Sequence, residues 1–309
     1  MTMIRTIRFL HPVTRTPHLG WLRGDEVVSL TSAVPEWTDP LAPWRALRAL
    51  GIAAEAGLAK VAERALRVRW QDLVDGRLLL PPVAAEEVWA AGVTYERSRV
   101  ARNAETKLQE SVYDRVYEAE RPELFFKATG RRVVPPLAPL GLRQDSRWMV
   151  PEPELAVAIT ASGEIVGWTL GNDLSSRDIE GENPLYLPQA KVFARSCSYG
   201  PALLWNTGAQ DPRSWQMEMV IWRQGQAVYR GAVPIRQMRR SAEELIAYLL
   251  RDNPILDGTV LFTGTGIVPP DDFTLQPGDV VDITVDEIGT LRNPIVAGGV
   301  KNCSLHDGQ

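Results

Sequence analysis

The sequence predicts an α+β fold that is mostly β, with a small N-terminal α/β domain ahead of a larger, strand-rich one. Helical spacing of apolar residues is concentrated in the Ala-rich stretch 43–68. From about Leu124 onward, β-branched runs alternate with Gly and Pro turns instead. The paired prolines Pro81-Pro82 between these parts are typical of a linker. We therefore expect a small domain over residues 1–77 and a large domain over residues 78–309.

The small domain is expected to combine strands with a helix pair. Residues 4–30 have the pattern of short strands, with Arg23-Gly24-Asp25 as the turn of a hairpin. The stretch 43–68 then has the spacing of two amphipathic helices, interrupted near Gly51 and Gly57.

The large domain is expected to open with one strand, residues 88–93, and a highly charged segment. Residues 96–120 carry charge on almost every face and few large apolar side chains, so we expect an exposed helix or a mobile lid there. From Leu124 onward, only residues 241–251 have helical spacing. The rest of this domain should therefore be β.

Composition and charge narrow the class of protein. The chain has 309 residues, 45% of them hydrophobic and 23% charged, which is enough to bury a sizeable core. Its 34 Lys and Arg against 38 Asp and Glu give a formal charge of −4, which provides no basic footprint for nucleic acid. The N-terminus lacks a continuous apolar stretch and no later segment reaches transmembrane length, so no membrane partner is expected.

Cysteine and histidine are scarce. The two cysteines, Cys197 and Cys303, lack the paired spacing of a metal knuckle and fit a reducing, cytoplasmic location. We expect both to be inert thiols. The three histidines are His11, His18 and His306, two near the start and one in the tail, which argues against a catalytic design with a central histidine.

A β-hairpin is predicted around Ser162-Gly163. Two strand-like segments, residues 151–159 and 165–173, flank this turn. A two-residue turn would pair Ala161 with Glu164, and this pairing fixes the partner of every residue further along the two strands.

This register brings three carboxylates onto one patch. Glu152 falls opposite Asp173, about 5 Å away between Cα atoms, and Glu154 shares the face of Glu152 because side chains alternate along a strand. Like charges repel at this separation, so a divalent cation is the natural occupant. Oxygen-only ligands suit Mg²⁺, with Mn²⁺ or Ca²⁺ as alternatives. The other interpretation is an edge strand whose acids face solvent, because a hairpin register can slip by one residue.

A series of motifs accompanies this hairpin in fixed order. They are Ala91-Gly92-Val93-Thr94-Tyr95, Pro122-Glu123-Leu124-Phe125-Phe126-Lys127, the Glu152/Glu154 pair, Gly171-Asn172-Asp173-Leu174-Ser175-Ser176-Arg177-Asp178, Lys191, and Thr263-Gly264-Thr265 ahead of Leu275-Gln276-Pro277-Gly278-Asp279. From about Leu78 to Cys303, the chain thus resembles the fumarylacetoacetate hydrolase family. The resemblance implies a mixed β-sandwich roll for the catalytic domain and Mg²⁺ ligation by Glu152, Glu154 and Asp173.

One departure separates the chain from the hydrolases of that family. Their lid carries Gly-x-Asn-Tyr-x-x-His-x-x-Glu, whose His and Glu activate water, and alignment on Gly92 and Tyr95 puts Ser98 and Ala101 in those places. Neither side chain can deprotonate water near neutral pH. With its Thr-Tyr-Glu-Arg-Ser lid and the run from 177 to 191, the chain resembles the 2-keto-3-deoxypentonate dehydratase branch instead.

That resemblance implies two catalytic residues. Glu123 matches the base that removes the C3 proton of a 2-oxo acid, and its apolar neighbours 124–126 could raise its pKa toward neutrality. The alternative is an exposed loop glutamate after Pro122. Lys191 is the candidate cation beside the metal, holding the enolate or the carboxylate, although a lysine on a strand is usually solvated.

Four further residues are expected to contact substrate. Arg177 matches a substrate contact of the family, although it could equally pair with Asp178 or orient a ligand carboxylate. Glu180 is a weaker contact, and Lys127 serves either the substrate or the structure. Thr265, expected in the Gly264-Thr265-Gly266 turn, offers hydroxyl and backbone N–H donors to a substrate carboxylate.

The function these features predict is Mg²⁺-dependent dehydration of a 2-keto-3-deoxy sugar acid, a pentonate giving 2-oxoglutarate semialdehyde through a metal-stabilised enolate. A diketo-acid (acylpyruvate-type) hydrolase is the enzyme alternative, provided that Glu96 or Glu105 replaces the missing dyad. A non-catalytic metal-binding ligand sensor is the third. Members of the family commonly associate, so we expect a homo-oligomer, either a dimer or a tetramer.

Overall fold

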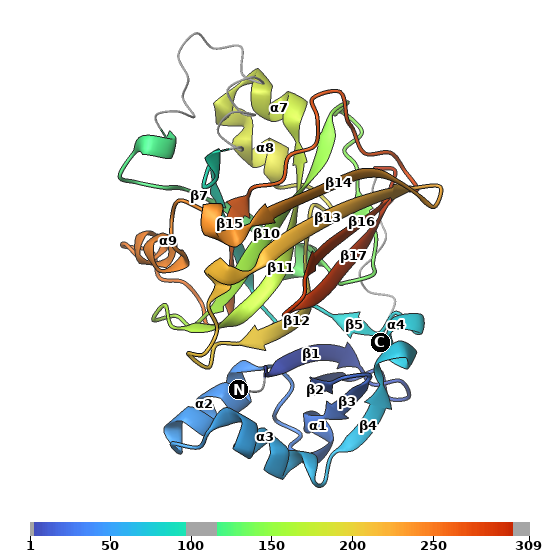
Figure 1. The fold of residues 1–309 in the computed structure, drawn as a ribbon, viewed down its shortest axis with the longest axis vertical. Helices are drawn as coiled ribbons and strands as arrows, with labels where there is room; N and C mark the ends of the chain where they lie inside the picture. Colours follow the sequence, from blue (N-terminus) through green and yellow to red (C-terminus); the bar gives the residue numbers. More distant parts are fainter. Residues whose placement is uncertain (1–2, 97–115, 299–309) are drawn as a thin grey trace.

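The computed structural model describes residues 3–96 and 116–298 (Figure 1). Its N-terminal part contains, in chain order, β1 (Arg5–Leu10), β2 (Pro17–Arg23), β3 (Glu26–Ser29), α1 (Leu30–Ala33), α2 (Leu41–Ala49), α3 (Ala54–Ala62), β4 (Leu66–Arg69), α4 (Trp70–Asp75) and β5 (Leu79–Leu80). The remainder contains β6 (Glu87–Gly92), β7 (Glu123–Thr129), β8 (Val133–Val134), β9 (Leu140–Gly141), β10 (Met149–Ile159), β11 (Ile165–Ser176), α7 (Arg177–Glu182), α8 (Leu187–Lys191), β12 (Cys197–Trp205), β13 (Gln216–Arg223), β14 (Gln226–Pro234), α9 (Ala242–Leu249), β15 (Thr259–Thr265), β16 (Val280–Val285) and β17 (Gly289–Val296).

Two sheets organise the described residues. The larger runs β4-β3-β2-β1-β12-β11-β10-β15-β6-β7, with β5 beside β1 and β8 beside β12. The smaller runs β14-β13-β16-β17-β9 and lies over β10 and β11 in Figure 1. A mostly β fold is therefore confirmed.

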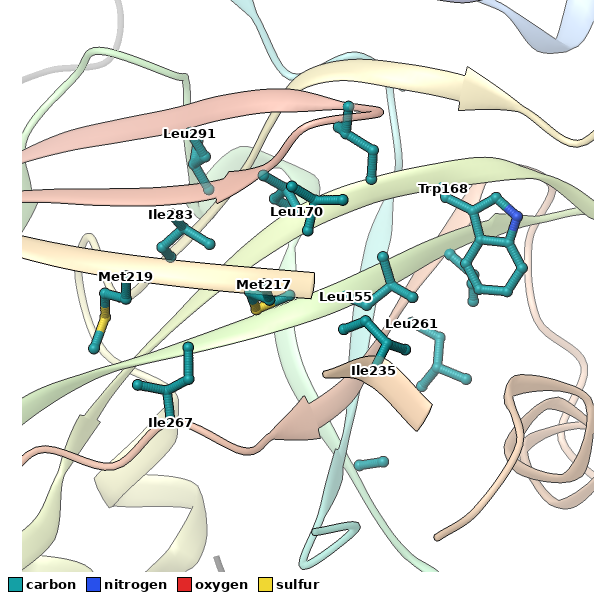
Figure 2. Packing of buried hydrophobic residues seen from close by; sticks show 14 of the residues in the cluster. Leu155, Trp168, Leu170, Met217, Met219, Ile235, Leu261, Ile267, Ile283 and Leu291 are labelled. Atoms are coloured by element: carbon teal, nitrogen blue, oxygen red, sulfur yellow. The ribbon is translucent and has the colours of Figure 1, made fainter. Parts of the chain in front are cut away.

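The main core fills the space between the two sheets (Figure 2). Leu155 and Leu170 project from the central hairpin toward Met217 and Ile283 of the smaller sheet, and all four are at most 1% exposed. Residues of β10 alternate between this core and the opposite face, where Ala156 packs in a second cluster with side chains of α2 and α3. Both faces of the central hairpin are therefore covered, and this rigid element carries the acidic residues.

The N-terminal elements match most of the sequence prediction. The hairpin turn lies at Gly24-Asp25 as expected, and the helix pair breaks at Gly51. A second break at Gly57 was wrong, because this residue lies inside α3, where its missing side chain lets Leu47 of α2 approach. The helical expectation for residues 66–68 was also wrong, since this segment is β4 and pairs with β3.

The division at residues 77 and 78 stays a prediction. Strand β1 pairs with β12, so the N-terminal strands extend the main sheet, and β5, just past the division, pairs back onto β1. In the remainder, the strand at residues 88–93 and the helix at 241–251 are confirmed as β6 and α9. The expected charged helix or lid falls largely on residues 97–115, outside the described residues. Within the part of the chain that is described, no helix has the length and apolar character needed to cross a membrane.

Candidate active site and metal centre

Glu152, Glu154 and Asp173 meet where the hairpin register predicts. Glu152 pairs with Asp173 across β10 and β11. One carboxylate oxygen from each residue lies within 4.8 Å of the other two, and the residues are 3%, 1% and 0% exposed. The interpretation as a solvent-facing edge strand was wrong, because β10 is paired on both sides, with β11 and β15.

The turn of the hairpin differs from the prediction. Ala161 does not pair with Glu164; instead Ile159 pairs with Ile165, and the Thr160 N–H donates to the Glu164 carbonyl at 3.0 Å. A register shift just before Ile159 then restores the predicted pairing along the rest of both strands. A β-bulge absorbs a one-residue slip in this way, so the error at the turn does not reach the carboxylates.

Three buried cations pair with Glu152 and Asp173 of the acidic cluster. The Lys191 Nζ donates to Glu152 Oε2 at 2.7 Å and to Asp173 Oδ2 at 3.2 Å. Lys127 forms an ion pair with Asp173, and the Arg177 Nη2 lies 3.0 Å from Glu152 Oε1. Formal charges in this cluster cancel when all six groups are ionised. Such matching allows the charges to be buried, because an unpaired charge would carry a large desolvation penalty.

Glu154 accepts a hydrogen bond from the backbone N–H of Gly264. Burial raises the pKa of Glu154 well above its usual value, and repulsion from Asp173 and Glu152 raises it further. Lys191 and the Gly264 N–H act in the opposite direction. Three oxygen donors that are close together and repel one another suit a hard divalent cation, so the residues present fit the predicted Mg²⁺.

Lys191 and Arg177 come from two short helices that follow β11. Helix α7 begins at Arg177, directly after the strand that carries Asp173, and α8 ends at Lys191. Two expectations were therefore wrong: Lys191 does not lie on a strand, and α9 is not the only helix after Leu124. The Lys191 ammonium is further held by the Ser175 hydroxyl, which accepts at 2.8 Å.

Arg177 was expected to contact substrate, to pair with Asp178 or to orient a ligand carboxylate. Its guanidinium pairs with Glu152 rather than with Asp178. Asp178 instead accepts hydrogen bonds from the Ser146 hydroxyl at 2.6 Å and from the Arg147 N–H at 2.7 Å. Arg177 is therefore placed to orient a carboxylate of the acidic cluster.

Glu123 is the first residue of β7 and lies directly over Gly92 of β6. The two residues are paired across the strands. A Cβ added at Gly92 would lie 2.1 Å from the Glu123 Oε2, so only glycine leaves room for this carboxylate. The side chain is half-buried, and the alternative of an exposed loop glutamate was wrong.

A small cavity joins Glu123 to the acidic cluster. Its polar lining is Glu123, Glu152, Glu180, Lys191 and Thr265, and its apolar wall is Phe125 with residues 91–93. The Lys191 Nζ lies 5.5 Å from the centre of the Phe125 ring, within cation–π range. Four of the six residues predicted for catalysis or substrate binding thus share one lining.

The two others lie deeper. Arg177 is 1% exposed behind Glu152, and Lys127 is 0% exposed behind Asp173. The Lys127 Nζ also donates to the carbonyls of Leu174 at 3.2 Å and Lys191 at 2.5 Å. Lys127 therefore ties the strand carrying Asp173 to the helix carrying Lys191.

Thr265 is the last residue of β15, so its predicted place in a turn was wrong. Its hydroxyl exchanges hydrogen bonds with the backbone of Ile267, at 3.2 Å to the carbonyl and 3.3 Å from the N–H. With 3% exposure, Thr265 presents a polar wall to the cavity.

Three residues around this site were given no individual role from the sequence. Phe125 was treated as a neighbour of Glu123, and Val93 and Thr94 only as part of a motif. Val93 has φ +52°, which is rare for a β-branched residue and is typical of strain at a functional site. The one available signal was that Thr94 stands where the hydrolase lid motif has Asn.

Of the cysteines and histidines, those that the structure describes (Cys197, His11 and His18) take no part in this cluster. Burial raises the pKa of the Cys197 thiol to about 12, which agrees with an inert thiol. His11 follows β1 and His18 lies in β2, and the centres of their rings are 4.8 Å apart. Cys303 and His306, together with Ser98, Ala101 and Glu105, lie outside the described residues.

Comparison with known proteins defines the class to which this fold and site belong. The family described as fumarylacetoacetate (FAA) hydrolase C-terminal matches residues 88–296. The chain therefore belongs to the fumarylacetoacetate hydrolase family.

Particular relatives narrow the class further. A probable 2-keto-3-deoxyxylonate dehydratase of Haloferax volcanii is 51% identical over 214 residues, 69% of this chain and 73% of that protein. The 2-dehydro-3-deoxy-D-arabinonate dehydratase of Saccharolobus solfataricus is 45% identical over 217 residues, 69% of this chain and 73% of that protein. A solved structure of 2-keto-3-deoxy-D-arabinonate dehydratase complexed with magnesium and 2,5-dioxopentanoate superposes with a TM-score of 0.78 at 34% identity, covering 95% of this chain and 99% of that one.

Proposed function

We propose that this protein is a magnesium-dependent dehydratase that converts a 2-keto-3-deoxypentonate into 2-oxoglutarate semialdehyde, also named 2,5-dioxopentanoate. The observation that carries the proposal is the cavity that Glu123 and Lys191 line together with Glu152 of the acidic cluster. Two relatives, 51% and 45% identical to this chain, are named as dehydratases of this class of acid. In the reaction a proton leaves C3 and hydroxide leaves C4, and tautomerisation then gives the aldehyde at C5.

Glu152, Glu154 and Asp173 would hold the magnesium ion. When bound, Mg²⁺ supplies positive charge beside the 2-oxo group and so favours loss of the C3 proton. Lys127 and Arg177 keep Asp173 and Glu152 in place by ion pairs. Buried partners of this kind fix the orientation of ligand carboxylates.

Glu123 takes the C3 proton. Its carboxylate is half-buried beside Phe125 and is held above Gly92, within the same cavity as the acidic cluster. Its place in this cavity suits a general base that removes the C3 proton.

The remaining residues of the lining bind and orient the acid. Lys191, with its ammonium between the acidic cluster and Phe125, places positive charge beside the developing negative charge. Glu180 and Thr265 lie on the same wall and position hydroxyl and carboxylate groups of the substrate. Arg177 and Lys127 contact substrate only if their ion pairs with Glu152 and Asp173 open, so orientation of the ligands is the role that we assign to both.

The absence of the hydrolytic His and Glu favours dehydration over the hydrolase alternative. Ser98 and Ala101 occupy the aligned positions in the sequence, and neither activates water. Of the two acids that could replace them, Glu96 is exposed. Dehydration requires a base and a stabilised negative charge, and the lining supplies groups for both.

One assay separates the candidates. The magnesium-loaded protein is incubated with a panel of 2-keto-3-deoxy acids and of acylpyruvates, and products are identified by mass. We expect a product lighter by one water from a 2-keto-3-deoxypentonate, and no such product after removal of magnesium with EDTA. Cleavage of acylpyruvates without any dehydration would assign the chain to the hydrolases, and turnover of neither class would favour a ligand sensor.

We further propose that the protein acts in the cytoplasm as a homo-oligomer, a dimer or a tetramer, with neither nucleic acid nor membrane as a partner. Two cysteines in 309 residues and a formal charge of −4 support the location and the absence of nucleic acid. Light scattering on the purified protein tests the oligomeric state directly.

A further inference from the structure

We infer that Thr94 is a positioning residue of the metal site, because its hydroxyl fixes the peptide group that holds Glu154. The inference rests on the proposed function, since it takes Glu154 to be a metal ligand. It adds a residue outside the acidic cluster and its ion-pair partners.

One peptide group connects Thr94 to Glu154. The Thr94 hydroxyl donates to the carbonyl of Thr263 at 2.7 Å. The N–H of the same peptide group, which belongs to Gly264, donates to the Glu154 Oε2. The carbonyl and the N–H of a trans peptide share one rigid plane and point in opposite directions. This plane is therefore held at both ends, by Thr94 on one side and by Glu154 on the other.

Removing the hydroxyl would affect both hydrogen bonds. Bonds in a chain polarise one another, so the N–H donates more strongly when its own carbonyl accepts. Thr94 and Thr263 are both 0% exposed, and Glu154 is 1% exposed. Bulk water therefore cannot substitute for the lost hydroxyl, and the peptide plane loses one of its two fixed points.

The backbone of Gly264 lies in close contact with the Thr94 side chain. It has φ +96°, which favours glycine. A Cβ at this position would lie 2.0 Å from the Thr94 Oγ1. Thr94 thus packs directly against the backbone that carries the donor, which leaves the Gly264 N–H little freedom to turn away from Glu154.

The position of Thr94 in the chain links the proposed base to the proposed metal site. Two residues earlier, Gly92 lies beneath Glu123, and Val93 lines the cavity between them with φ +52°. The backbone carbonyl of Thr94 accepts from the Arg239 N–H at 2.9 Å, which anchors the segment from its other side. A displacement of this short segment would reach Glu123 and Glu154 together.

A matched pair of variants tests the role of the hydroxyl. Thr94→Ala and Thr94→Ser both lose the methyl group, and only Thr94→Ala also loses the hydroxyl. The measurement is Mn²⁺ affinity by isothermal titration calorimetry on protein freed of metal with EDTA. Loss of a partner that orients a metal ligand weakens binding by about 10- to 100-fold. We expect a loss of about 10-fold or more in Thr94→Ala and binding close to wild type in Thr94→Ser.

Thr259→Ala is the control for loss of a buried threonine hydroxyl in the same sheet. Its hydroxyl donates to the Leu256 carbonyl at 2.7 Å, and the residue is 0% exposed like Thr94. Because Thr259 lies at the other end of β15 from the peptide group that holds Glu154, we expect Mn²⁺ affinity within about threefold of wild type, well inside the change expected for a lost orienting partner.

Equal affinity of Thr94→Ala and Thr94→Ser would overturn the inference, and so would a loss in Thr259→Ala as large as that in Thr94→Ala. If Thr94→Ala does not fold, Thr94→Val is titrated in its place, because valine keeps the shape of threonine and lacks the hydroxyl. The titration uses no sugar acid, so a wild-type protein that binds Mn²⁺ but dehydrates nothing would refute the proposed function and leave this inference to be decided by its own variants.

Discussion

Replacement of Glu123 by glutamine separates proton removal from metal binding. The amide keeps the shape of the carboxylate above Gly92 but cannot accept a proton near neutral pH. The structure limits side effects on metal binding, because Glu123 begins β7 whereas the three carboxylates of the acidic cluster come from β10 and β11. The loss should therefore appear in the chemical step alone.

The expected loss follows from the role of the base. General-base catalysis is typically worth about 10²- to 10⁴-fold, so kcat should fall by roughly that factor, or about 2.7 to 5.4 kcal/mol at 1.36 kcal/mol per tenfold. Mn²⁺ affinity and the unfolding midpoint should stay close to wild type. Semialdehyde formation measures kcat, and deuterium uptake at C3 in D₂O reports proton removal directly. The matched control is Glu118→Gln, the same change at an exposed glutamate five residues before Glu123.

Two results would refute this reasoning. A Glu123→Gln protein with wild-type kcat would show that another group removes the C3 proton. A protein that lost both turnover and Mn²⁺ affinity would place Glu123 in the metal site instead. Slow deuterium uptake with intact metal binding is the outcome that the geometry predicts.

Four further changes test separate parts of the site. Glu154→Ala should abolish calorimetric Mn²⁺ binding and dehydration together, and full affinity with full turnover would exclude Glu154 as a ligand. Gly92→Ala should lower kcat with little change in Mn²⁺ affinity, because its Cβ would lie 2.1 Å from the Glu123 Oε2; unchanged kcat would contradict the placement of this carboxylate. Lys127→Met should lower the free energy of unfolding by about 3–5 kcal/mol in urea, since it removes one partner of a buried pair; a loss below about 1 kcal/mol would count against that pairing. Burial raises the pKa of Asp178, but hydrogen bonds from the Arg147 N–H and the Ser146 and Ser176 hydroxyls outweigh burial and lower the pKa overall. Its stabilisation is therefore present above the unfolded pKa of about 3.9 and is lost as pH falls through the lower folded value, so urea midpoints at pH 7 and pH 3 should differ less in Asp178→Asn than in wild type.

The acidic cluster was predictable because one periodicity places all three residues. Side chains alternate strictly along a strand, so the hairpin alone puts Glu152 and Glu154 on one face and sets Asp173 opposite. The prediction of the turn was wrong by one residue, and a bulge absorbed the difference. A sequence does not show where such a bulge lies, so the correct pairing depended on an irregularity that could not be foreseen.

The partners of the cluster could not be predicted in the same way. Helices α7 and α8 have six and five residues, too few turns for a 3.6-residue period to be visible. Periodicity therefore does not show that Arg177 and Lys191 fold back over the hairpin, and only the family resemblance placed these two residues near the metal. The contact of Lys127 with Asp173 joins residues from two strands that are not neighbours in the sheet, and no local pattern encodes such a pairing.

The order of strands explains how the proposed base and the proposed metal ligands share one cavity. Neighbours in the main sheet run β10, β15, β6 and β7, and they contribute Glu154, Thr265, Gly92 and Glu123 in that order. The sheet curves along this order, because Lys127 of β7 forms an ion pair with Asp173 of β11, four strands away. Gly92 has no side chain, so the Glu123 carboxylate can also lie back over β6. Glu123, Thr265 and Glu152 therefore line one cavity. The parallel pairing that creates this order joins Val260 to Val88, residues so distant in the chain that only the folded structure brings the base and the metal ligands together.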